Sequence, residues 1–380
     1  MSKCIVCGSE LRAKDLLMRC TDMPEGAQKI PSREELDHDT GITLNLYQCS
    51  ACGLVQFDGE PVAYYRDVIR SGGYSSTMRE LRRSQYSRFI DLCGLRGKRI
   101  IEIGCGQGEF LQVLTEFPVE AYGIEHNAAL AEIAQGKGLN VWTAFADAES
   151  TELKGAPYDA FLSFNFLEHQ PDPNGMLRCI YRNLTEEGYG LVTVPSFEYS
   201  LEQESYYELL HDHIANYTED TLRYLMNRNG FVVLDCARIN RDTLSAIVQK
   251  RRRTDVEGLI RNRAHLTQQL REFIRQHMER NMRIAIWGAS HQAFTLIATT
   301  GIGENVSYII DSAPFKQGKF APVSHVPIKA PEHFFEEPVE CILIVAPGYT
   351  EEIAEIIRSR FGKETKIFVL RSASLEPWTD

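Results

Sequence analysis

No stretch of this 380-residue chain approaches the roughly 18 uninterrupted apolar residues that a membrane-spanning helix requires. The N-terminal segment MSKCIVCGSE also has no apolar region of the kind found in secretory signal peptides. Hydrophobic residues make up 43% of the chain and charged residues 24%, which is the balance of a globular protein. We therefore expect a protein that has no membrane partner and stays in the cytoplasm.

A surplus of positive charge is missing as well. The chain has 41 Lys and Arg residues against 52 Asp and Glu residues, which gives a net charge of −11. Because proteins bind phosphate backbones through Lys and Arg, this balance argues against a nucleic-acid partner. The basic run KRRRT at 250–254 is followed by mixed charge, and we interpret it as a solvated helix face.

The chain has ten cysteines, but their clustering is not typical of a disulfide framework. Cys4 and Cys7 form one C-x-x-C pair and Cys49 and Cys52 form another, and each pair is followed by glycine. Two such turns present four thiolates to one tetrahedral Zn²⁺, whereas four unrelated thiols are the alternative. The 41 residues between the pairs predict an inserted loop. Closed four-thiolate sites are structural, so we expect the zinc to fold a small module.

The length of the chain predicts two or three domains. After the cysteine pairs, apolar segments typical of strands alternate with helical segments, which predicts an α/β fold with a parallel sheet. A long charged amphipathic stretch then precedes a second alternating unit. The expected organisation is a zinc-binding module at 1–65, an α/β core at 66–250, a helical linker at 251–281 and a Rossmann-like α/β domain at 282–380.

The segment KRIIEIGCGQG predicts a strand that runs into a turn containing Gly104, Gly106 and Gly108. Such turns hold polar cofactors through backbone N–H groups and the N-terminus of the following helix. Glu125 ends the next predicted strand, where a carboxylate can accept hydrogen bonds from a ribose diol. The glycine spacing is compatible with a dinucleotide site, but the acidic Glu102 just before the turn favours another cofactor.

This E-x-G-x-G-x-G segment resembles the first motif of the class I S-adenosylmethionine-dependent methyltransferases, and the resemblance extends over about 85–200. It implies a Rossmann-like core in which the leading acid lies near the methionine amino group and the second acid holds the ribose. Glu168 and His169 lie in a later segment that in this class shapes the cofactor side of the site more often than it supplies a base. The resemblance implies these cofactor-binding residues: Glu102, Gly104, Gly106, Gly108, Glu125, Asp147 for the adenine amine, and Asn165.

Nearly the whole chain is similar to a narrower family, the three-domain sugar C-methyltransferases that act on nucleotide-linked keto-deoxysugars. These proteins have a cysteine-ligated zinc module, a methyltransferase core and a Rossmann-like C-terminal domain. The segment GGYSSTMRE at 72–80 resembles the Tyr-Ser-rich segment that closes over their site. The resemblance implies a nucleotide-sugar substrate for this chain, and we expect a monomer or a homodimer.

A carbon acceptor places particular demands on such a site, because the C–H beside a ketone must lose a proton and the enolate needs hydrogen-bond donors. In the C-methylating relatives one segment reads Tyr-x-Glu-His, with the histidine as candidate base. Here it reads Leu210-His211-Asp212-His213. The resemblance implies His213 as the base, Asp212 as the carboxylate that orients it, and Tyr74 as a hydroxyl that assists the acceptor oxygen.

Several alternatives stay open. Asp in place of Glu at 212 and Leu in place of Tyr at 210 are compatible with an O- or N-methyltransferase that acts on another sugar or a small natural product. His213 could instead be a structural imidazole. A non-catalytic cofactor-binding module is a third possibility, although the intact glycine turn counts against it. In the C-terminal domain, Gly288 is followed by no further glycine at dinucleotide spacing, so this domain either binds part of the substrate or is structural.

Overall fold

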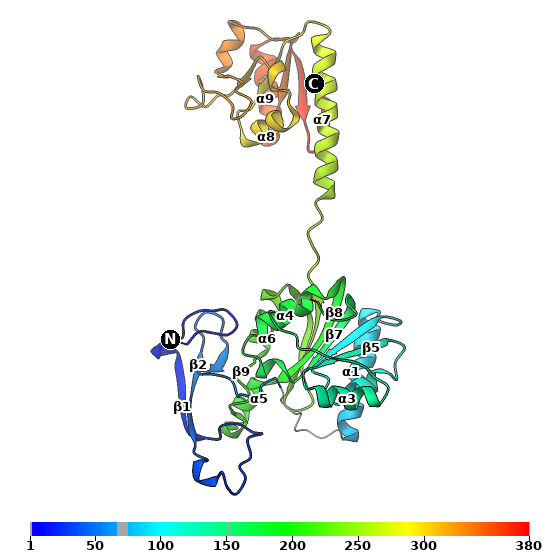
Figure 1. Ribbon diagram of the computed structural model, residues 1–380. Helices are drawn as coiled ribbons and strands as arrows, with labels where there is room; N and C mark the ends of the chain where they lie inside the picture. The colour runs from blue at the N-terminus through cyan, green and yellow to red at the C-terminus, as the bar shows by residue number, and fades with distance from the viewer. Residues whose placement is uncertain (1, 67–74, 150–151, 380) are drawn as a thin grey trace. The chain divides into compact units, whose positions relative to one another are not determined.

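The computed structural model describes residues 2–66, 75–149 and 152–379, which form two compact units, Met1–Arg253 and Thr254–Asp380 (Figure 1). Tyr74 lies outside the described residues, so its expected role stays a prediction. Within the described ranges, no helix is both long and apolar enough to cross a membrane.

The first unit begins with a small antiparallel sheet, ordered β1-β2-β3-β9. Its last strand comes from much later in the chain and pairs Ala215 with Gln56 and Asn216 with Val55. The N-terminal module that carries the four clustered cysteines (residues 1–65, called the cysteine module below) is therefore joined by backbone hydrogen bonds to the segment that directly follows His213. The strands are β1 (Leu16–Met23), β2 (Ile42–Gln48), β3 (Val55–Phe57) and β9 (Ala215–Asn216).

The main sheet of this unit has seven strands in the order β10-β11-β8-β7-β4-β5-β6. Neighbours from β8 to β6 are parallel, whereas β11 lies between β8 and β10 and is antiparallel to both. The carboxyl ends of the parallel strands consequently meet at one edge, where open α/β sheets bind ligands. The strands are β4 (Arg99–Ile103), β5 (Glu120–Glu125), β6 (Asn140–Thr143), β7 (Tyr158–Phe164), β8 (Leu184–Pro195), β10 (Phe231–Ile239) and β11 (Thr243–Lys250).

Helices cover both faces of this sheet (Figure 1). The alternation of side chains along β4 shows why: Ile101 and Ile103 pack in one apolar cluster with α4 and α6, and Ile100 packs in another with α1 and α2. Both faces are apolar, as expected for a sheet buried between two helical layers. The helices are α1 (Ser76–Cys93), α2 (Glu109–Leu114), α3 (Ala128–Gly136), α4 (Pro173–Arg182), α5 (Phe197–Glu202) and α6 (Glu219–Arg228).

The second unit is a six-stranded sheet ordered β14-β13-β12-β15-β16-β17, parallel except for β17. The helix expected at 251–281 is α7, and its residues Leu270, Phe273 and Ile274 belong to the apolar core of this unit. The elements are α7 (Glu257–Met278), β12 (Ile284–Trp287), α8 (His291–Thr300), β13 (Tyr308–Ile310), β14 (Ile328–Lys329), β15 (Cys341–Ile344), α9 (Thr350–Arg360), β16 (Lys366–Leu370) and β17 (Leu375–Pro377).

Candidate active site and thiol cluster

The two C-x-x-C pairs, 41 residues apart in sequence, come together in space. The four Sγ atoms of Cys4, Cys7, Cys49 and Cys52 all lie within 4.8 Å of one another, and the Cys4–Cys52 and Cys7–Cys49 sulfur distances are both 3.5 Å. Zn–S bonds of about 2.3 Å in a tetrahedron correspond to sulfur separations of about 3.8 Å. The thiol cluster therefore has dimensions that suit one zinc ion.

The methyltransferase-type turn lies at the carboxyl end of β4. Gly104, Gly106 and Gly108 adopt positive φ angles of 69°, 57° and 79°. Gly108 is required for a second reason, since a Cβ there would lie 2.3 Å from Cδ1 of Leu139. Gly104 and Gly106 line the cavity described below, together with Gln107 of the same turn.

The two acids expected at the cofactor lie on neighbouring parallel strands. Glu102 is fully buried on β4 directly before the turn. Glu125 ends β5, and its carboxylate accepts hydrogen bonds from the N–H groups of Gly106 (2.8 Å) and Asn127 (2.9 Å). Because a carboxylate has about four lone-pair sites, Glu125 can support the turn and still accept hydrogen bonds from a ribose.

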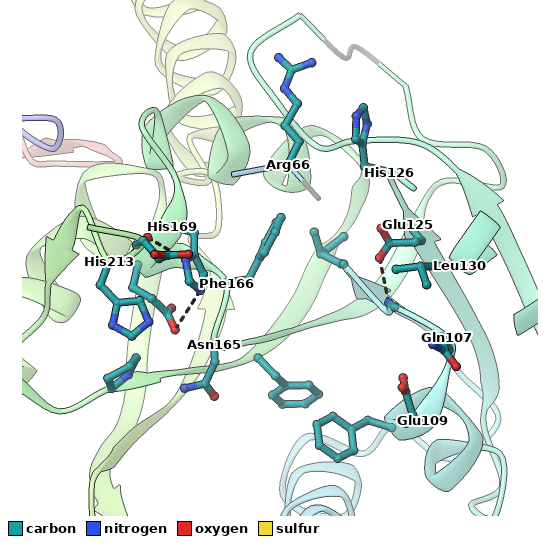
Figure 2. A pocket seen from close by; sticks show the side chains of 18 of the residues that line it. Arg66, Gln107, Glu109, Glu125, His126, Leu130, Asn165, Phe166, His169 and His213 are labelled. Carbon is teal, nitrogen blue, oxygen red and sulfur yellow. Dashed lines mark hydrogen bonds and ion pairs between the residues drawn. The ribbon is translucent and has the colours of Figure 1, made fainter. Parts of the chain in front are cut away.

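A cavity of about 520 Å³ opens above the turn and the ends of β5 and β7. Figure 2 shows the histidine pair of residues 169 and 213 on one side of it and Glu125, His126 and Leu130 on the opposite side. Ala27 and Gln28 from the inserted loop of the cysteine module also line this cavity. The N-terminal module therefore supplies part of the wall of the site.

The side of the cavity near β5 is aromatic. The ring of Phe145 makes edge contacts with His126 and Phe166, at centroid distances of 5.4 and 6.0 Å. The guanidinium carbon of Arg66 lies 5.0 Å from the Phe145 centroid, and Arg66 Nη2 lies 3.8 Å from an oxygen of Asp147. These groups suit a flat, polar-edged ring such as adenine. Asp147 is not among the residues that line the cavity, so its expected contact with the adenine amine stays a prediction.

The opposite side of the cavity carries two imidazoles in contact. The rings of His169 and His213 have centroids 4.8 Å apart. His169 Nδ1 donates to the carbonyl oxygen of Asp212 (2.7 Å), so Nε2 carries the lone pair of the neutral ring, 3.9 Å from an oxygen of Glu168. Burial lowers the pKa of both histidines, and for His213, where the neighbouring ring adds to the effect, the pKa falls to about 3. Both rings are therefore neutral near pH 7, and each has one ring nitrogen with a free lone pair.

The Asp212 side chain does not orient His213, which corrects the expectation from the sequence. Its carboxylate is buried and accepts hydrogen bonds from the Tyr64 hydroxyl and the Ala27 N–H, both at 2.7 Å. Within the described ranges, no hydrogen bond joins this carboxylate to the imidazole of His213. The reason is local geometry: residues 211–212 form a turn and not a helix, which directs the carboxylate to the cysteine module.

His211 also faces the module. Its two ring nitrogens lie 2.7 Å from the carbonyl oxygen of Glu25 and 2.9 Å from that of Glu60. His211 and His213 consequently contact different parts of the protein, and the HDH tripeptide does not form a metal site of its own.

Two contributors to the site were not assigned such roles from the sequence. His169 was interpreted as an element that shapes the cofactor side, but it is one half of the histidine pair. Tyr64 lies in a loop without any motif, and only its place in the tertiary structure reveals its bond to Asp212. The proximity of the histidines is similarly non-local, because 43 residues separate His169 from Asp212, the residue that fixes its ring.

Comparisons with known proteins agree with this geometry. Residues 78–235 match a family described as a methyltransferase domain, and residues 254–370 match the C-methyltransferase C-terminal domain. C-methyltransferase NovU of Streptomyces niveus is 22% identical over 93% of this chain and 92% of its own length. The ubiquinone biosynthesis O-methyltransferase of Pseudomonas fluorescens is 29% identical over 25% of this chain and 43% of its own length.

Among solved structures, the magnesium protoporphyrin IX methyltransferase of Synechocystis with bound SAH is 15% identical to this chain. The match covers 49% of this chain and 92% of that one, with a TM-score of 0.37. The glycine turn, the two acids and the order of the strands, in a region that matches a methyltransferase domain, all agree with the fold class predicted from the sequence. The chain is therefore an S-adenosylmethionine-dependent methyltransferase with a class I, Rossmann-like core.

Proposed function

We propose that this methyltransferase transfers a methyl group to a carbon atom of a nucleotide-activated keto-deoxysugar. The similarity to NovU over nearly the full length of both chains and the match to the C-methyltransferase C-terminal domain support a carbon acceptor. The observation that carries the proposal is the neutral histidine pair beside a buried carboxylate in the cavity. A carbon acceptor needs such a base, whereas oxygen and nitrogen acceptors lose a proton more easily.

S-adenosylmethionine supplies an electrophilic methyl group when it is bound. The glycine turn and Glu125, which line the cavity, would hold the cofactor, and the family resemblance assigns Glu102 to its methionine amino group. On the other side of the cavity, His213 removes the proton from the carbon beside the ketone, and the C–H electron pair becomes the enolate. Bound S-adenosylmethionine would supply the methyl group to that carbon, and its sulfur would keep the electron pair of the broken methyl–sulfur bond. The protein contributes alignment and a positioned base.

The protonated form of His213 must be stabilised by its surroundings, because the low pKa of His213 means that its charged form is costly. The buried Glu168 carboxylate lies 3.9 Å from His169 Nε2, so a positive charge on the histidine pair would be offset by a neighbouring negative charge. The bond from His169 Nδ1 to the Asp212 carbonyl fixes the tautomer that leaves Nε2 facing Glu168. We therefore assign His213 as the base and His169 with Glu168 as the groups that stabilise its protonated form.

We further propose that the four thiols of the cysteine module hold one structural zinc ion, which the dimensions of the cluster support. The partner we propose is the nucleotide-sugar substrate, with no nucleic acid and no membrane involved. A monomer or homodimer in the cytoplasm, where free thiols persist, is consistent with the ten unpaired cysteines of the structure.

An O-methyltransferase is the second candidate. The match to a ubiquinone biosynthesis O-methyltransferase and the absence of a phenol at position 210 favour it. In that case the acceptor hydroxyl would lose its proton to His213, and no carbon proton would be exchanged.

One experiment separates the two candidates. The protein is incubated with methyl-labelled S-adenosylmethionine and a panel of nucleotide-sugars with and without a keto group, and the product is analysed by NMR. We expect a new C–CH₃ group in a keto-sugar, together with loss of deuterium placed beside the ketone. A product carrying O–CH₃ or N–CH₃, with the deuterium retained, would refute carbon transfer. His213→Gln should lower turnover at least about a hundredfold while cofactor binding is retained.

A further inference from the structure

A second, smaller cavity of about 170 Å³ adjoins the cofactor cavity. The two cavities share lining residues, so they meet at one place, which we call the neck. Its residues are Asn165, Pro195, His213, Asp242 and Thr243.

The smaller cavity has a polar lining. Tyr199, Glu208, Asn216 and Asp242 contribute an aromatic ring, two carboxylates and an amide. The amide nitrogen of Asn216 is buried and, in the part of the chain that the structure describes, has no hydrogen-bond acceptor. A buried N–H group without an acceptor is costly, so this lining is suited to a ligand that carries several hydroxyl or carbonyl oxygens.

Asn165 lies at the neck in a conformation that the surrounding structure fixes. It directly follows β7 and has a φ of 47°, in the left-handed region that asparagine tolerates better than most residues. Its backbone N–H donates to the carbonyl oxygen of Thr193 (2.8 Å), and the Thr193 hydroxyl donates to Oδ1 of its side chain (3.0 Å). Thr193 itself is fully buried. The amide oxygen is thereby engaged, whereas the Nδ2 group has no hydrogen-bond acceptor among the described residues and can donate into the cavity.

Figure 2 shows Asn165 on the same side of the cavity as His213. An acceptor placed at the neck would therefore meet a base and an N–H donor together. When the base removes a proton beside a ketone, negative charge develops on the ketone oxygen, and a donor already oriented at that oxygen stabilises the charge without reorganisation.

We propose that the smaller cavity is the binding site of the acceptor sugar and that Nδ2 of Asn165 donates to its ketone oxygen as the enolate forms. This inference rests on the proposed function and deepens it. Asn165 is then a catalytic residue on the acceptor side, in addition to its expected place beside the cofactor, and Thr193 is the positioning residue that fixes the orientation of its amide.

The test uses the full-length protein and the keto-sugar that gives product in the panel described above. Asn165→Asp keeps the size of the side chain and its tolerance of positive φ but replaces the donor with a negatively charged acceptor. We expect kcat to fall about a hundredfold or more, as for loss of an oxyanion donor, while the dissociation constant of S-adenosylhomocysteine, measured by calorimetry, changes by less than about threefold. Exchange of the proton beside the ketone with D₂O, measured with S-adenosylhomocysteine bound, should fall in parallel.

Matched variants separate this role from a structural one. Thr193→Val removes the hydroxyl that holds the amide and should lower kcat about tenfold, whereas Thr193→Ser, which keeps the hydroxyl, should restore most of the activity. Ser200→Phe fills only the smaller cavity and should raise the acceptor KM about tenfold or more without changing cofactor affinity.

The outcomes are distinct. If the wild-type protein methylates none of the keto-sugars, the proposed function fails and this inference fails with it. If the wild-type protein does methylate one, but Asn165→Asp weakens cofactor binding and regains normal kcat at saturation, Asn165 belongs to the cofactor site and the inference is wrong. An unchanged acceptor KM in Ser200→Phe would refute the assignment of the smaller cavity.

Discussion

Replacing Tyr64 by phenylalanine tests the junction between the cysteine module and the active site. The Tyr64 hydroxyl donates to Asp212 Oδ1 (2.7 Å) and accepts from the N–H of Gln28 (3.0 Å). Gly26 packs so closely on this phenol that a Cβ there would lie 2.2 Å from its oxygen. Burial, with a contribution from Asp212, raises the pKa of Tyr64 to about 12, so the phenol remains a donor at any working pH.

The expected loss can be worked out from these contacts. Tyr64→Phe leaves the buried Asp212 carboxylate with the Ala27 N–H as its one remaining donor among the described residues. Hydrogen bonds to charged groups contribute about 1.5–3 kcal/mol, so the free energy of unfolding of the first unit should fall by that amount. For a unit of this size, such a loss lowers the melting temperature by roughly 3–12 °C.

The assay is thermal or denaturant unfolding of the purified chain, with Tyr207→Phe as the matched control. Tyr207 is 72% exposed and makes no hydrogen bond within the described ranges, so its replacement should change the stability by less than about 0.5 kcal/mol. Combining Tyr64→Phe with Asp212→Asn should give less than the sum of the single losses, because the two residues share one bond. Equal melting temperatures for the two tyrosine variants, or additive losses in the double variant, would refute the reasoning.

Three further results are expected. Elemental analysis should find one zinc per chain. A strong chelator or Cys49→Ser should lower the melting temperature, because loss of the metal destabilises the cysteine module. A metal-free protein that is as stable as the untreated protein would contradict the zinc site. Gly108→Ala should weaken cofactor binding and lower the free energy of unfolding by more than about 1 kcal/mol, because φ is 79° and Leu139 occupies the space that the new Cβ would need. Gly136→Ala is the control and should be neutral, because a Cβ there meets nothing within 4 Å. Equal effects of the two variants would argue against the packing explanation. Burial lowers the pKa of His213 from 6.5 to about 3. Between these two pH values, His213 takes up a proton in the unfolded chain but not in the native protein. Its contribution to the free energy of unfolding is therefore complete above pH 6.5 and is lost as the pH falls towards 3. His213→Gln should therefore flatten this acid loss in pH-dependent unfolding, and the acid limb of kcat/KM should lie well below pH 6.5. A midpoint near 6.5 would show that the pKa of His213 is not lowered in the native protein.

The parts of this protein that sequence patterns predicted are those governed by neighbours in the chain. Glycines spaced two apart after an apolar strand predicted the turn at 104–108, and its three glycines all have positive φ. The position of the second acid, Glu125, was predictable because one helix and one strand of ordinary length separate the glycine turn from the end of the neighbouring parallel strand. The apolar run before the turn likewise predicted β4, and Glu125 ends β5, as expected.

Contacts between distant segments were not predictable in the same way. The family resemblance implied that the Asp212 carboxylate orients His213, but a turn directs the carboxylate to Tyr64, which lies 148 residues away. The orientation of Asn165 depends similarly on a hydroxyl of the neighbouring strand β8. No local spacing encodes either contact.

The sequence by itself determined the class of chemistry, because a glycine turn, two acids and two thiol pairs are short-range patterns with specific physical requirements. The tertiary structure decided which groups meet across the cavity: it placed His169 against His213, engaged Asp212 with the cysteine module, and brought a second cavity to the neck beside Asn165. The physical reason is that the conformation of a turn depends on adjacent residues, whereas the surroundings of a base depend on how separate strands and loops pack together.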